Sequence, residues 1–153
     1  MKLLIPILAL FLFGFQSLAQ GPDCANAQPF CTDNNYVFPA SVNTNPEVGP
    51  DYGCLGTQPN PAWYYIQIAQ SGNLVIDLGS TNGLDDIDFI CWGPFNSLTN
   101  ACNQLTGGGA FDMCTLFGTY PCGNIVDCSY SANPTETCTI NGAVAGQFYM
   151  FLI

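Results

Sequence analysis

With 153 residues, the chain has the length of a single domain, and its composition is strongly acidic. Eleven Asp and Glu residues stand against one cation, Lys2, and no histidine, so the formal net charge is −10. This balance excludes nucleic-acid binding, because phosphates are bound by cations, and it excludes a Ser-His-Asp or Cys-His catalytic site, which needs a histidine base. Partners without negative charge remain, such as neutral glycans or Ca²⁺.

Residues 1–19 have the layout of a secretory signal peptide. Lys2 is the positive start, residues 3–15 form an apolar run, and small residues precede the expected cleavage after Ala19. The apolar run is shorter than the roughly 20 residues that a membrane span needs. We therefore expect residues 20–153 to form a secreted domain, extracellular or on the outer cell surface, that does not insert into the membrane.

The first clear strands lie in the middle of the chain. Apolar and polar side chains alternate over residues 63–68 and 73–78, which predicts two strands, and the turn-forming residues 70–73 predict that they form a hairpin. A short edge strand is expected at residues 36–38. On the two main strands the following apolar side chains are expected to face inward: Tyr64, Ile66, Ile68, Leu74, Ile76 and Leu78.

The second half of the chain continues this pattern and adds one helix. Apolar residues from Leu98 to Leu105 recur at helical spacing, and Ser97 can cap that helix. Further strands are expected at residues 87–92, 124–130, 137–140 and 147–153. Many short strands separated by turns predict an all-β, disulfide-stapled sandwich, jelly-roll-like, with one short helix. Because the last apolar strand ends without a turn, we expect a C-terminally truncated domain whose final strand lies downstream.

Nine cysteines follow the signal segment, and a secreted chain with this density is expected to form disulfides. A zinc site is disfavoured by the absence of histidine and of C-x-x-C pairs. The odd number predicts that Cys24 pairs with a tenth cysteine downstream. Choosing the shortest loops for the others gives these pairs: Cys31–Cys54, Cys91–Cys102, Cys114–Cys122 and Cys128–Cys138.

Three aspartates form the most conspicuous polar cluster. Asp86 and Asp88 would project to one side of a strand, and Asp85 lies in the loop before it. Since Ca²⁺ prefers six to eight hard oxygen ligands, these carboxylates with nearby loop carbonyls are a candidate calcium site. The alternative is structural: Asp85 closes a turn, Asp86 is solvated, and Asp88 accepts backbone hydrogen bonds at the end of a sheet.

Aromatic residues gather around two of the predicted strands, and exposed aromatic rings can stack on sugars. We select Tyr65 and Trp92 as candidate glycan-binding residues. The alternative is that these rings pack in the core, as aromatic side chains on strands commonly do. The only glutamates, Glu47 and Glu136, lie in turn-like segments, so no carboxylate pair for glycoside hydrolysis stands out and no catalytic residue is assigned.

Six segments carry a family likeness: DCANAQPFC (23–31), GCLG (53–56), PAWYY (61–65), SGNL (71–74), DIDF (86–89) and DCSYS (127–131). In this order they resemble a domain common in secreted cell-surface proteins of Bacteroidetes, which is similar to bacterial pre-peptidase C-terminal domains. The resemblance implies a jelly-roll β-sandwich at the front of a longer protein exported by type IX secretion. It implies no catalytic residues.

The resulting hypothesis is a non-catalytic extracellular binding or adhesion module of a larger secreted or cell-surface protein. Its partner would be a neutral glycan or a matrix or cell-surface protein, with Ca²⁺ as a possible cofactor. Two alternatives stay open: an accessory domain of a secreted peptidase or glycosidase whose catalytic domain lies downstream, and a structural spacer.

Overall fold

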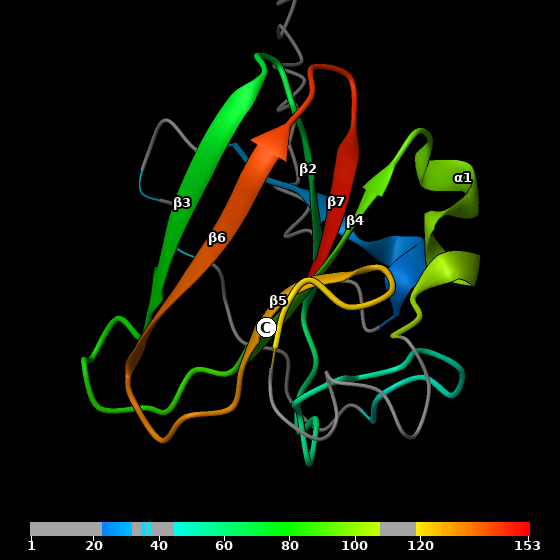
Figure 1. Cartoon of the computed structure of the whole chain (residues 1–153). Helices are drawn as coiled ribbons and strands as arrows, with labels where there is room; N and C mark the ends of the chain where they lie inside the picture. Colours follow the sequence, from blue (N-terminus) through cyan, green and yellow to red (C-terminus); the bar gives the residue numbers. More distant parts are fainter. Residues whose placement is uncertain (1–22, 32–34, 36, 38–44, 108–118) are drawn as a thin grey trace, which may run out of the picture.

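The computed structural model describes residues 23–31, 35, 37, 45–107 and 119–153 (Figure 1). The predicted signal peptide and most of the predicted strand at 36–38 lie outside these residues. The secondary structure is mainly β, as expected. In chain order the elements are η1 (Cys24–Asn26), β1 (Gln28–Pro29), β2 (Trp63–Gln67), β3 (Gly72–Gly79), β4 (Phe89–Phe95), α1 (Leu98–Ala101), η2 (Cys102–Gln104), β5 (Ile125–Ser129), β6 (Thr135–Ala143) and β7 (Phe148–Leu152).

The strands form two sheets. Five strands pair in the order β1-β2-β7-β4-β5, and β3 pairs with β6 in a separate two-stranded sheet. The pairing of β1 with β2 is parallel and the other pairings are antiparallel. The predicted hairpin of residues 63–68 with 73–78 is therefore wrong. Both edges of β2 are occupied, by β1 and by β7, so the turn after β2 carries the chain to the other sheet.

Two apolar clusters lie on opposite faces of the five-stranded sheet. The first fills the space between the sheets and includes Tyr64 and Phe151 on one side with Ile76 and Ile140 on the other. The second lies on the opposite face, around Trp92, and is covered by η1, α1 and the loop of residues 45–61. In Figure 1, β3 and β6 lie on one side of the large sheet and α1 lies on the other. The domain is an all-β, disulfide-stapled sandwich with an extra covering layer.

This layering explains which strands alternate in burial. Strand β3 exposes one face to solvent, so Val75 is exposed while Ile76 is buried. Strand β4 lies between β7 and β5 in the large sheet, and all but one of its residues are buried because both of its faces are covered. The inward faces predicted for residues 64–68 and 74–78 are confirmed by their packing in the inter-sheet cluster.

The predicted helix is present and short. The Ser97 hydroxyl accepts a hydrogen bond from the backbone N–H of Thr99 at 3.1 Å, which satisfies a donor of the first turn. The α-helix covers Leu98–Ala101 and continues as one 3₁₀ turn. Ala101 and Leu105 are buried in the cluster around Trp92, so the apolar face that predicted the helix also fastens it to the sheet.

The disulfides differ from the predicted pairs. Cys24 bonds to Cys102 and Cys54 bonds to Cys128, across sequence separations of 78 and 74 residues. The predicted pairs Cys31–Cys54, Cys91–Cys102 and Cys128–Cys138 are therefore wrong, and so is the prediction that Cys24 pairs with a tenth cysteine downstream. Cys122 is disulfide-bonded, and its predicted partner Cys114 lies outside the described residues. Short loops in sequence did not decide the pairing, because the fold brings together segments from opposite ends of the domain.

Candidate functional site

Two hollows adjoin the Cys24–Cys102 disulfide. The first, of about 170 Å³, has the half-buried ring of Tyr65 in its wall, and we call it the Tyr65 hollow. The second, of about 400 Å³, is the Glu47 hollow. Ala25 and Cys102 contribute to both, so the two hollows are neighbours on one surface. The other lining residues of the Tyr65 hollow are Cys24, Ala27, Leu98 and Met150, and those of the Glu47 hollow are Glu47, Val48, Gly49, Pro50 and Asn103.

The walls of the hollows are tied to one another. The disulfide fastens η1 to η2, and the backbone N–H of Cys24 donates to Glu47 Oε2 at 2.9 Å, which joins η1 to the loop of residues 45–61. Tyr52 donates its hydroxyl to the backbone oxygen of Glu47 at 2.8 Å. Burial, and secondarily the charge of Glu47, raises the pKa of Tyr52 to about 12, so this donor keeps its proton at physiological pH.

Tyr65, a predicted glycan-binding residue, is partly exposed to solvent. It pairs with Pro29 of β1 and Met150 of β7, and its ring centroid is 6.4 Å from that of Phe148. It packs beside the cluster around Trp92 and remains partly exposed in the wall of the hollow. Such a ring offers apolar surface to a ligand while its backbone stays fixed in the sheet.

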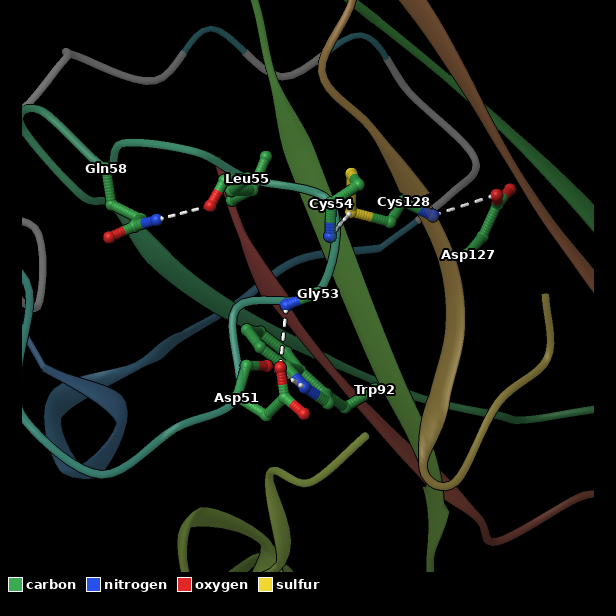
Figure 2. Close-up of a disulfide and its surroundings, with 8 residues drawn as sticks. All are labelled: Asp51, Gly53, Cys54, Leu55, Gln58, Trp92, Asp127 and Cys128. Carbon is green, nitrogen blue, oxygen red and sulfur yellow. Dashed lines mark hydrogen bonds between the residues drawn. A yellow bond between two sulfur atoms is a disulfide. The ribbon is translucent and has the colours of Figure 1, made fainter. Parts of the chain in front are cut away.

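Trp92 does not have the predicted role. Its side chain is 0% exposed and stacks on Trp63, with ring centroids 5.4 Å apart and planes 16° apart. The indole Nε1–H donates to the backbone oxygen of Asp51 at 3.2 Å (Figure 2). The expectation of an exposed sugar platform is wrong here because the second face of the large sheet is covered by the helix and the loop of residues 45–61.

Asp51 is one of the residues that anchor the loop of residues 45–61. One carboxylate oxygen accepts the Gly53 N–H at 3.0 Å, and the other accepts the Gly107 N–H at 3.1 Å. Figure 2 shows the hydrogen bond between Asp51 and Gly53, with the Trp92 side chain beside Asp51. This anchor sits next to Pro50 in the wall of the Glu47 hollow. Sequence analysis missed Asp51 and assigned no role to Glu47 or Asn103, since their partners are distant in sequence and no local pattern marks them.

The three aspartates of the predicted calcium site do not converge. Asp85 is exposed and accepts a hydrogen bond from Asn82 Nδ2 at 2.7 Å, which closes a local turn. Asp86 is exposed, whereas Asp88 Oδ1 and Glu136 Oε1 are buried and accept no hydrogen bond. Among the described residues, no three His, Cys, Asp or Glu side chains are grouped so that they could hold a metal ion. The arrangement agrees better with the structural alternative, since the Ser131 backbone hydrogen-bonds to Asp88.

Burial, followed by the charges of Asp86 and Glu136, raises the pKa of Asp88. Because its folded-state pKa lies above the unfolded-state value, the ionised carboxylate lowers stability above that pKa, and the penalty disappears as the pH falls towards about 3.9. We expect Asp88→Asn to raise the free energy of unfolding at pH 7 by on the order of 0.5 kcal/mol, because much of the charge effect is screened by solvent. Thermal unfolding of both proteins from pH 3.5 to 7 measures this difference.

The same experiment tests the calcium hypothesis, which predicts the opposite sign. A bound Ca²⁺ would stabilise the folded state, so EDTA would lower the melting temperature of the parent protein, and Asp88→Asn would be destabilising. Glu136→Gln is the matched variant, because it removes a neighbouring charge that raises the pKa of Asp88, and it should stabilise the fold in the same pH range. A lower melting temperature for Asp88→Asn at pH 7 would contradict our account of this pair.

No protein-family model, curated protein or solved structure is significantly similar to the chain. The described residues contain no helix that is long and apolar enough to cross a membrane.

Proposed function

We propose that the chain is a non-catalytic extracellular binding module that takes a neutral glycan, or a neutral segment of a matrix or cell-surface protein, in the two hollows beside Cys24–Cys102. The observation that carries this proposal is the half-buried Tyr65 ring in the wall of a hollow whose sides are joined by a disulfide. A wall that is already fixed loses little conformational freedom on binding, which favours affinity.

The chemistry of the Glu47 hollow complements that of the Tyr65 hollow. Glu47 and Asn103 supply a carboxylate and an amide near an apolar wall that includes Val48, whose side chain is fully exposed. An apolar stacking surface beside a few polar groups suits a sugar ring, which presents both C–H faces and hydroxyls. The formal charge of −10 disfavours anionic ligands, so a neutral glycan is the preferred class.

Disulfide bonds are consistent with an extracellular location, because they persist in oxidising compartments. We further propose export by type IX secretion as the front module of a longer Bacteroidetes surface protein. The support for this part is the resemblance of six sequence segments to such domains, together with an all-β sandwich of the kind that the resemblance implies.

The test is binding of the purified chain to an array of neutral oligosaccharides, with sulfated and sialylated glycans for comparison. We expect binding to neutral members only, and we expect Tyr65→Ala to weaken it about 30-fold, as for an aromatic anchor worth roughly 2 kcal/mol. Tyr65→Phe should retain most of the affinity because it keeps the ring.

Tyr130→Ala is the matched control, since Tyr130 is 49% exposed and belongs to neither hollow. It should bind like the parent protein. Equal binding by Tyr65→Ala and Tyr130→Ala would contradict the assignment of the Tyr65 hollow. Absence of binding by the parent protein to neutral glycans and to immobilised matrix proteins would contradict the proposed function as a whole.

A further inference from the structure

Two cysteines face each other across the core of the sandwich. Cys91 belongs to β4 of the large sheet and Cys138 to β6 of the small sheet, and both are 0% exposed. Both lie in the inter-sheet cluster, and the side chain of Cys138 contributes to the raised pKa of the Cys91 thiol. The two sulfur atoms are therefore neighbours in the place where the two sheets pack together.

Asp127 independently fixes this juxtaposition. It is the register partner of Cys91 on β5, and its Oδ2 accepts the backbone N–H of Thr139, the residue after Cys138, at 2.7 Å. Its Oδ1 accepts the backbone N–H of Cys128 at 2.9 Å. One carboxylate thus holds β6 against the edge of the large sheet directly beside the thiol pair. Contacts other than those of the sulfur atoms therefore hold β6, which carries Cys138, beside the large sheet, which carries Cys91.

We propose that Cys91 and Cys138 form a further structural disulfide in the exported protein, which links the two sheets through the core. In this step two S–H bonds break and one S–S bond forms. The two electrons and two protons pass to an exchanging disulfide, on a small molecule or an oxidoreductase, which becomes a dithiol. Because both thiols are buried in the folded domain, the exchange takes place before the sandwich closes.

The surroundings disfavour the other roles of a cysteine pair. Burial raises the pKa of the Cys91 thiol, with further contributions from Cys138 and from the charge of Asp127. A thiol that resists ionisation is a poor nucleophile and a poor metal ligand. Among the described residues, no three His, Cys, Asp or Glu side chains here are grouped so that they could hold a metal ion, and both Asp127 oxygens accept backbone N–H groups. Oxidation during folding needs only an accessible thiolate in the unfolded chain, so it is compatible with this environment.

Peptide mapping of the exported chain tests the proposal directly. The protein is denatured without reductant, alkylated with iodoacetamide and digested with pepsin, because no Lys or Arg follows Lys2 and acid suppresses disulfide exchange. We expect a peptide pair joined through Cys91 and Cys138, with neither residue alkylated. Alkylation of either residue, or its linkage to another cysteine, would overturn the proposal.

A stability measurement supplies a second readout. The double variant Cys91→Ala with Cys138→Ala should melt about 10 °C below the parent protein, since it loses a cross-link that closes a long loop. Cys31→Ala is the control, because Cys31 is exposed and free in the structure, and it should melt like the parent. A decrease of less than about 3 °C in the double variant would count against the disulfide.

Discussion

Replacing Trp92 with alanine is expected to lower the free energy of unfolding by about 3–5 kcal/mol. The side chain is 0% exposed and stacks on Trp63, so its removal leaves a cavity in the cluster on the second face of the large sheet. The backbone oxygen of Asp51 also loses its indole donor. Urea unfolding followed by far-ultraviolet circular dichroism measures the change, which is large against a typical domain stability of about 5–15 kcal/mol.

Trp92→Phe is the matched variant, because it keeps an aromatic ring over Trp63 and removes the Nε1–H donor. Its loss of stability should be smaller than that of Trp92→Ala. The difference between the two variants therefore measures the packing of an aromatic ring at this position, since both lack the donor to Asp51. A stability of Trp92→Ala within about 0.5 kcal/mol of the parent would mean that the indole behaves as a surface side chain, as the glycan-platform hypothesis had it.

Removing the Cys54–Cys128 disulfide is expected to cost about 4 kcal/mol. The bond spans a sequence separation of 74 residues and joins the loop of residues 45–61 to β5 (Figure 2). Without it the unfolded chain gains conformational freedom, and the folded loop loses a covalent anchor to the sheet. The double variant Cys54→Ala with Cys128→Ala, compared with the oxidised parent by thermal and urea unfolding, measures the effect.

This disulfide also affects the candidate binding surface. Residues Glu47 to Pro50 line the Glu47 hollow and lie on the loop that the disulfide and Asp51 hold. The double variant should therefore lose affinity in the glycan assay at temperatures where it is still folded. A variant whose melting temperature stays within a few degrees of the parent would show that the loop is anchored by its noncovalent contacts alone.

Local features of the chain were predictable from sequence. Residues 64–68 and 74–78 present their predicted faces to the core, because side chains on a strand alternate whatever the strand pairs with. The helix at Leu98 was predictable for a similar reason, since spacing and the Ser97 cap act within one turn. The general disulfide-stapled, all-β character followed from composition and turn spacing.

Pairings between distant segments were decided by the tertiary structure. Strand β2 pairs with β7 and β3 with β6, and Cys24 and Cys54 pair with cysteines more than seventy residues away. No local pattern contains this information, since the energies that choose among such pairings come from packing both faces of the large sheet at once. The same reason explains why the two candidate glycan-binding residues differ in exposure. Tyr65 and Trp92 look alike in sequence. In the structure, Trp92 is buried beneath the layer formed by the helix and the loop of residues 45–61, whereas Tyr65 remains partly exposed in the wall of a hollow.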